Sequence, residues 1–241
     1  MCKDHDNAYC ENIIPMNFGG RRPDGESPVK LPDGSKLNSC FFGQSCFAKL
    51  AVVHRSSIVK VPSDTPLEVF APLGCGIQTG VGAVRNALNV KPGSSLAVFG
   101  VGSVGLSAIM AAKIVGAKTI IAVDVHQSRL DLANRLGATD CILGSEEDLV
   151  QKIVALCPPH GVNFAVDCSG VPKVIESMID SLGVRGRACT IGSPGPGIRA
   201  GVNIANHLIR GREYVGTHQG GSISAEVSEI PVLIVLATLH D

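Results

Sequence analysis

The chain lacks tryptophan and has few other aromatic residues, with two Tyr and seven Phe among 241 residues. Charge is also scarce: charged residues make up 17%, and 21 Lys plus Arg balance 21 Asp plus Glu. Without net charge, bulk electrostatics does not favour nucleic acid or an anionic membrane as a partner. No apolar run approaches the roughly 18 residues of a spanning helix, so no membrane span is expected. The polar N-terminus has no signal-peptide pattern, and a cytoplasmic location is expected.

Cysteine and glycine, in contrast, are abundant, at nine and 28 residues. Without a secretory signal, the cysteines are interpreted as reduced thiols or metal ligands rather than as a disulfide framework. The 45% hydrophobic content is enough to bury a sizeable core. The opening stretch MCKDHDNAYC places Cys2 and Cys10 in a polar loop. On local grounds this pair is a disulfide, half of a metal site, or neither.

The character of the sequence changes along the chain. Residues 1 to about 70 are irregular, with strand-like fragments such as LAVVHRSSIVKV (50–61). From about 78 to 217, short apolar runs alternate with helical spacing, as in the stripe from Val104 to Val115. This alternation predicts an α/β fold with a doubly wound parallel sheet covered on both faces. The expected strands are 95–100, 119–124, 141–144, 163–170, 187–193 and 212–217.

The strongest local signal is the stretch AVFGVGSVG, which contains Gly100, Gly102 and Gly105 in a G-x-G-x-x-G pattern. It follows an expected strand and opens an expected helix. Glycines there permit a tight turn and let the backbone approach a pyrophosphate at the positive helix N-terminus. The next expected strand ends at Asp124, 19 residues beyond Gly105, where an acid accepts from a ribose 2′-hydroxyl. Because an acid repels a 2′-phosphate, the sequence predicts a site that prefers NAD to NADP.

Other residues leave alternatives open. Arg129 is either a ribose contact or a solvated helix charge. Cys75, in APLGCGIQTGVGAV, is either a small residue in a tight turn or a thiolate metal ligand near the cofactor. A short-chain dehydrogenase is disfavoured, since neither Tyr9 nor Tyr214 begins the Tyr-x-x-x-Lys pair that such enzymes need.

Several runs together resemble the zinc-containing medium-chain alcohol dehydrogenases, closest to the aryl or benzyl alcohol branch. They are CENIIPMNFGGRRPDG, FFGQSCFAKLAVV, PLGCGIQTGVGAV, the glycine pattern with Asp124, and VGTHQGGS. The resemblance covers almost the whole chain. It implies a Rossmann domain joined to a mostly-β, GroES-like catalytic domain. It also implies hydride transfer between a primary, aromatic alcohol and NAD, with zinc polarising the alcohol oxygen.

The resemblance further implies site residues. Cys75 matches the third protein ligand of the catalytic zinc, and Thr79 a residue lying against the nicotinamide. Arg129 matches the basic residue beside the adenosine ribose. Ile191 and Thr217 fall in the two backbone segments that hold the carboxamide. The implied phosphate-binding turn consists of Gly100, Val101, Gly102, Ser103, Val104 and Gly105.

The same resemblance implies that both zinc sites are incomplete. Cys2 and Cys10, with seven residues between them, match the third and fourth ligands of the structural zinc. The remaining structural ligands, and the first Cys and the His of the catalytic site, would lie upstream of Met1. Two thiolates leave an open, weak site, because structural zinc takes four protein ligands.

Candidate substitute ligands are weak. His5 could add a ligand between Cys2 and Cys10, and His218 is a polar contact near the nicotinamide. His54 is interpreted as a half-exposed strand residue. Cys40 and Cys46 are expected to be small loop residues.

The expected domains are a partial GroES-like catalytic domain (1–77), an NAD-binding Rossmann domain (78–217) and a truncated return to the catalytic domain (218–241). The last of these ends in the apolar stretch VLIVLATLHD, unlike the family. We expect an NAD-dependent alcohol dehydrogenase that is impaired as this chain. The alternatives are a non-catalytic NAD-binding remnant and a zinc-free reductase, the latter disfavoured by Cys75. Expected partners are a small alcohol or aldehyde and further copies of the chain, in a homodimer or homotetramer.

Overall fold

The structure is a computed structural model, and it describes residues 7–43, 48–54 and 57–223. The chain divides into two compact units, Met1–Thr65 and Pro66–Asp241. The second unit begins with two short helical segments, α2 (Leu67–Phe70) and η4 (Ala71–Gly74). None of the helices within the described ranges combines the length and apolar character needed to cross a membrane.

The described part of the first unit consists mainly of turns. It contains the 3-10 turn η2 (Asn7–Tyr9) and the helix α1 (Ile13–Phe18). Isolated antiparallel bridges pair Gly20 with Cys40 and Lys30 with Lys36. Cys40 is buried, at 6% exposure.

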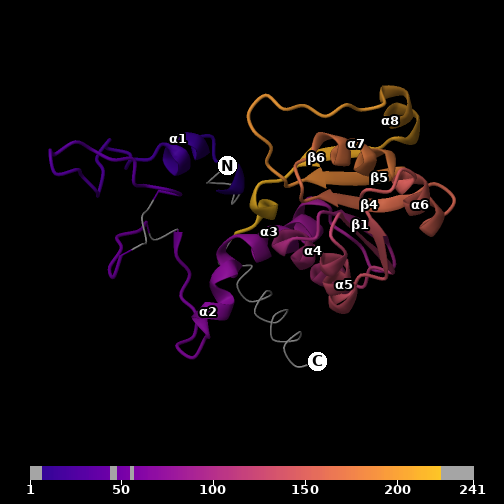
Figure 1. Ribbon diagram of the computed structural model, residues 1–241, viewed down its shortest axis with the longest axis horizontal. Helices are drawn as coiled ribbons and strands as arrows, with labels where there is room; N and C mark the ends of the chain where they lie inside the picture. Colours follow the sequence, from indigo (N-terminus) through magenta and orange to yellow (C-terminus); the bar gives the residue numbers. More distant parts are fainter. Residues whose placement is uncertain (1–6, 44–47, 55–56, 224–241) are drawn as a thin grey trace. The chain divides into compact units, whose positions relative to one another are not determined.

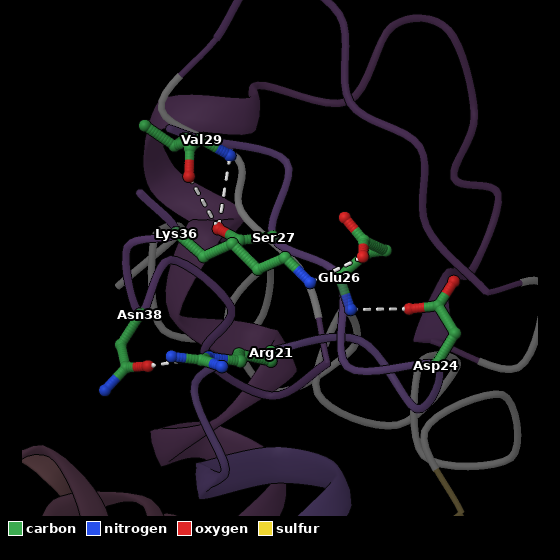
Figure 2. A network of polar contacts seen from close by, with 7 residues as sticks. All are labelled: Arg21, Asp24, Glu26, Ser27, Val29, Lys36 and Asn38. Atoms are coloured by element: carbon green, nitrogen blue, oxygen red, sulfur yellow. Dashed lines mark hydrogen bonds and ion pairs between the residues drawn. The ribbon is translucent and has the colours of Figure 1, made fainter. Parts of the chain in front are cut away.

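A polar network joins the turns between residues 21 and 38 (Figure 2). The Lys36 ammonium lies 2.6 Å from the Glu26 carboxylate, and its hydrogen bond and charge lower the pKa of Glu26. The Ser27 hydroxyl donates to the Val29 carbonyl at 2.7 Å. Because the ion pair is exposed to solvent, it contributes little to the free energy of unfolding.

The strand expected at 50–61 is wrong. The described residues of this fragment, 50–54 and 57–61, contain no strand, and the side chains of Leu50 and Val52 are 91% and 86% exposed. The fragment has the composition of a strand, but a strand also needs a neighbour to satisfy its backbone hydrogen bonds. His54 is therefore an exposed loop residue rather than a half-exposed strand residue.

A six-stranded, all-parallel sheet forms the centre of the second unit (Figure 1). The strand order is β3-β2-β1-β4-β5-β6, the order of dinucleotide-binding sheets. All six expected strands are confirmed, with the largest boundary difference at the start of β5. The bounds are β1 (Ser95–Phe99), β2 (Thr119–Asp124), β3 (Asp140–Leu143), β4 (Val162–Asp167), β5 (Leu182–Thr190) and β6 (Glu213–Gly216).

Helices cover both faces of this sheet, as predicted (Figure 1). Side chains alternate along each strand. In β1, Leu96 and Val98 join the cluster with α4 and α5, whereas Ala97 and Phe99 join the cluster with α6 and α7. Because both of its faces are buried at the centre of the sheet, β1 is a continuous apolar run and β2 is nearly so. The helices are α3 (Gly76–Gly82), α4 (Ser103–Val115), α5 (Gln127–Leu136), α6 (Leu149–Leu156), α7 (Pro172–Asp180) and α8 (Ile204–Arg210).

The helix α4 has the apolar stripe expected from its sequence. Ala108 and Ala111 are buried, and Val115 packs against the same cluster. The helix ends at Gly116, whose φ of 85° lies in the left-handed region and whose N–H bonds to carbonyls of the last turn. Since α4 follows β1 directly, its N-terminus lies at the carboxyl edge of the sheet.

Candidate coenzyme site

The expected coenzyme residues lie at one edge of the sheet, where the carboxyl ends of the parallel strands meet. The strand order reverses between β1 and β4, and ligands of such sheets bind outside the strands at this switch point. Gly100 follows β1, and Asp124 ends β2. Ile191 follows β5, and Thr217 follows β6, where its N–H donates to the Thr190 carbonyl at 3.0 Å. The structure therefore brings these separate segments to one edge.

Each of the three positions in the turn favours glycine for a different structural reason. Gly100 has a φ of 86°, which favours glycine. At Gly105, an added Cβ would lie 2.1 Å from the Gly100 carbonyl oxygen, so the close packing of α4 on the turn requires glycine. At Gly102, an added Cβ would meet no protein atom within 4 Å. Gly102 is therefore not explained by the packing of the chain on itself.

This open position fits a bound pyrophosphate. Gly102 is the N-cap of α4, has an ordinary φ of −74° and makes no side-chain cap. The space beside it lets a ligand approach the backbone, and the first turn of the 13-residue helix supplies a positive end. Ser103 is exposed and Val104 partly buried at this turn. The residues therefore suit a dinucleotide.

Asp124 is held firmly beside the turn. Its side chain is 4% exposed. Its carboxylate accepts from the Val101 N–H at 2.8 Å and from the His126 N–H at 3.0 Å. The Arg129 guanidinium, 52% exposed, lies 3.6 Å from the same carboxylate. The N–H of Val101 is thus committed to the Asp124 carboxylate.

The helix α3 runs along the first turn of α4. A Cβ added at Gly80 would lie 2.2 Å from the Val104 carbonyl oxygen, and one added at Gly76 would lie 3.7 Å from the Ser103 Cβ. Glycines thus permit the close approach of the two helices. Cys75 and Thr79 are carried on α3 beside the start of α4; the Cys75 side chain is exposed and Thr79 is buried.

The segment after β6 packs on α3 in turn. A Cβ added at Gly220 would lie 2.6 Å from the Thr79 carbonyl oxygen. The Ser222 hydroxyl donates to the Gln78 carbonyl at 3.3 Å. His218, partly buried, precedes the 3-10 turn of this segment, η6 (Gln219–Gly221). The expected nicotinamide-side residues Thr79 and Thr217 therefore belong to packed neighbouring segments.

The described residues do not provide a zinc site. Throughout these ranges, no three His, Cys, Asp or Glu side chains form a group that could hold a metal ion. Cys75 is exposed in the second unit, and Cys10 is partly buried in the first. Cys2, His5 and Cys46 lie outside the described residues. No chemical step is assigned to a metal on this ligand set.

Sequence reasoning missed one residue of this edge, Asp167. It ends β4 as Asp124 ends β2, its side chain is fully buried, and burial raises the pKa of its carboxyl group. The sequence contained a signal in NFAVDCSG, where an acid at the end of an apolar run precedes Ser and Gly. Asp124 shares only its place at the end of an apolar run, and its distance from the glycine pattern is what singled it out.

A cavity of about 300 Å³ lies elsewhere in the second unit. It is lined in part by Asp180 and Arg212, which precede β5 and β6 and so mark the amino ends of the strands. The expected coenzyme residues lie at the carboxyl ends. This cavity is therefore separate from the candidate coenzyme site.

The family model described as zinc-binding dehydrogenase matches residues 103–234. The chain belongs to the zinc-binding dehydrogenase family. It is 43% identical to an alcohol dehydrogenase zinc-binding domain protein from Burkholderia ambifaria, with a TM-score of 0.91 over 99% of this chain and 64% of that chain. For benzyl alcohol dehydrogenase from Acinetobacter calcoaceticus, the identity is 38% and the TM-score 0.90, over 98% and 64% of the two chains.

A further relative of this chain is the geraniol dehydrogenase of Castellaniella defragrans. It is 42% identical over 197 residues, which are 81% of this chain and 52% of that enzyme. These comparisons confirm the family and the Rossmann fold expected from the sequence. The chain spans 52% to 70% of the length of the curated relatives that it matches. The activity of a complete relative therefore does not transfer directly to it.

Proposed function

We propose that this chain binds NAD and forms the coenzyme-binding part of a zinc-type alcohol dehydrogenase. The observation that carries the proposal is the glycine turn at the switch point of the sheet. Its first and third glycines are required by the fold, whereas Gly102 leaves open space that suits a pyrophosphate. Asp124, held at the end of β2, supplies the ribose acceptor that favours NAD over NADP.

In this proposal, each segment of the carboxyl edge has one task. The first turn of α4 binds the pyrophosphate, and Asp124 with Arg129 binds the adenosine ribose. Thr79 lies against the nicotinamide, and the backbone at Ile191 and Thr217 holds the carboxamide. Bound NAD supplies the carbon atom that accepts a hydride. The domain limits 1–77, 78–217 and 218–241 belong to the same proposal.

The proposed substrate is a primary, aromatic alcohol. Support comes from the names of the relatives, benzyl alcohol dehydrogenase and geraniol dehydrogenase, both of which act on primary alcohols. Cys75 is the residue proposed to ligate the catalytic zinc, a Lewis acid for the alcohol oxygen. Since the described residues offer no group of three metal ligands, we propose that alcohol oxidation by this chain is impaired.

Coenzyme titration tests the proposal. The chain has no Trp, so the energy-transfer signal from Trp to NADH is absent. Isothermal titration calorimetry with NAD and NADP is therefore the suitable measurement. We expect NAD to bind more tightly than NADP. Absence of measurable binding for both would refute the proposal.

A second candidate function is that of a non-catalytic NAD-binding protein. The lack of a three-ligand group among the described residues favours it. Both candidates require NAD binding, so the discriminating measurement is NADH formation from benzyl alcohol in the presence of added zinc. Turnover that depends on Cys75 supports the enzyme, and NAD binding without turnover supports the second candidate.

We also propose a homodimer or homotetramer. The strand β6 (Glu213–Gly216) is an edge strand of the sheet, and Tyr214 on it is 39% exposed. An edge strand presents backbone donors and acceptors that can pair with a second copy. Light scattering should show a defined dimer or tetramer, whereas a clean monomer would contradict this part of the proposal.

A further inference from the structure

Asp167 binds the two turns that follow β4 and β5. Its carboxylate accepts from the Ser169 N–H at 2.9 Å and the Ser169 hydroxyl at 2.6 Å. The Gly170 N–H lies 3.2 Å from each carboxylate oxygen. The backbone carbonyl of Asp167 accepts from the N–H groups of Ile191 at 2.9 Å and Gly192 at 3.2 Å. One residue therefore fixes both turns.

These two turns pack against each other without spare room, and the first of them lies close to the glycine turn. A Cβ added at Gly192 would lie 2.0 Å from the Gly170 nitrogen. A Cβ added at Gly100 would lie 3.3 Å from the Ser169 nitrogen. Gly170 itself has a φ of 69°. A displacement of the Ser169–Gly170 turn must therefore also move the segment at Ile191.

The hydrogen-bond donors around the buried Asp167 side chain explain why a carboxylate occupies this position. Burying a charged group costs free energy, and burial raises the pKa of Asp167, while its bonds to Ser169 and Gly170 act in the opposite direction. An ionised carboxylate has only acceptors, which matches the donors that face it: the Ser169 N–H and hydroxyl, the Gly170 N–H and the Thr190 side chain. An amide of the same size would present its NH₂ group to some of these donors.

Asp167 does not act by contact with a ligand. Its side chain has 0% exposure, so it touches neither substrate nor coenzyme. Its effect must pass through the turns that it holds. Ile191 is in the turn proposed to hold the carboxamide, whereas Asp124 is held independently by the N–H groups of Val101 and His126.

We propose that Asp167 is a positioning residue for the nicotinamide half of the coenzyme, acting through the Ser169–Gly170 turn and the segment at Ile191. The inference rests on the proposed NAD binding. It predicts that a change at Asp167 weakens the binding of the nicotinamide half of the coenzyme more than that of the adenosine half. Loss of the Asp167 carboxylate should weaken NAD strongly, but leave a ligand that has only the adenosine half nearly unaffected.

The test compares dissociation constants for NAD and AMP by calorimetry, on the whole 241-residue chain. For Asp167→Asn, we expect NAD to bind about tenfold or more weakly, because hydrogen bonds to a charged acceptor are lost. AMP should lose much less affinity than NAD, because Asp124 is held by the Val101 and His126 N–H groups and not by Asp167. Ser169→Ala removes the hydroxyl that donates to Asp167 and accepts from the Val171 N–H. It keeps the carboxylate and its backbone donors, so it should weaken NAD less than Asp167→Asn does. The control is Asp131→Asn, an exposed acid on α5, which should change neither ligand.

Three results would overturn the proposal. They are an unchanged NAD affinity in Asp167→Asn, an equal loss of NAD and AMP in that variant, and, if that variant does not fold, an unchanged NAD affinity in Ser169→Ala. The unaltered chain provides a separate check on the proposed function. If it binds no NAD, the proposed function itself fails and this inference falls with it. If it binds NAD, the variants decide the role of Asp167 alone.

Discussion

Two buried aspartates occupy equivalent positions at the ends of β2 and β4, but their neighbours give them different roles. Asp124 accepts two backbone N–H groups and has the half-exposed Arg129 guanidinium at 3.6 Å. Asp167 is fully enclosed by the turn that follows it. The first arrangement suits ligand recognition, and the second suits support of the backbone. Residue type and strand position alone do not distinguish the two roles.

The position of Asp124 leads to a prediction about coenzyme choice. Asp124→Asn removes a negative charge and keeps one oxygen, which can accept from either the Val101 or the His126 N–H while the amide NH₂ group faces the other. With no charge facing the 2′ position, affinity for NADP relative to NAD should rise at least about tenfold. Calorimetry with both coenzymes measures the ratio. If the unaltered chain already binds NADP as tightly as NAD, Asp124 does not have the role assigned to it.

Thiol reactivity should follow burial. Burial raises the pKa of Cys189 to about 12, so at pH 8 only roughly one in 10,000 of these thiols is ionised and reactive. The Cys75 thiol is exposed. Iodoacetamide should therefore modify Cys75 in the native chain and Cys189 only after unfolding, as detected by mass spectrometry of peptides. Cys75→Ser is the matched control, and native labelling of Cys189 would contradict the burial of β5.

At the scale of elements, the helices and strands that could be predicted from the sequence are those whose apolar periodicity matches their burial. The central strands β1 and β2 were found because burial on both faces makes them apolar runs, and α4 was found because its stripe and glycine turn agree. The fragment 50–61 has the composition of a strand, but its described residues form none, because strand formation also depends on pairing that is not encoded locally. The role of Asp167 depends on contacts with the turn at Ile191, more than 20 residues away. Such contacts appear only once the sheet is assembled.

The glycine turn gives the sharpest prediction at this scale, since its glycines differ in what a methyl group would meet. Gly105→Ala places a Cβ against the Gly100 carbonyl and should cost about 1–3 kcal/mol of unfolding free energy. Gly102→Ala meets open space and should cost less than about 1 kcal/mol, the range of N-cap changes. Its methyl group would nevertheless occupy the space proposed for the pyrophosphate, so NAD affinity should fall about tenfold or more.

Denaturant unfolding and NAD titration of the two glycine variants check this contrast. Gly102→Ala should be folded but defective in binding. If it binds NAD normally, the open space at Gly102 is not the phosphate site. If Gly105→Ala is as stable as the unaltered chain, then α4 and the turn have room for a methyl group and glycine is not required at position 105.

At the scale of the whole molecule, the coenzyme site and the metal site have different requirements. The candidate coenzyme site is assembled within the second unit, from turns at one edge of one sheet. A catalytic zinc takes three protein ligands and an open position, and the described residues offer Cys75 without a group of three. We therefore expect this chain to bind NAD even when it holds no zinc.

We predict that the purified 241-residue chain binds NAD, contains well under one zinc per chain and shows negligible oxidation of benzyl alcohol. A single thiolate does not hold zinc against competing ligands, and without the metal the alcohol keeps a pKa far above neutrality. Elemental analysis and an absorbance assay for NADH measure both quantities. Cys141→Ser, which removes another exposed thiol of the second unit, is the control for Cys75→Ser. Stoichiometric zinc together with turnover that only Cys75→Ser abolishes would show that other residues of the chain, His218 first among them, complete the site with Cys75.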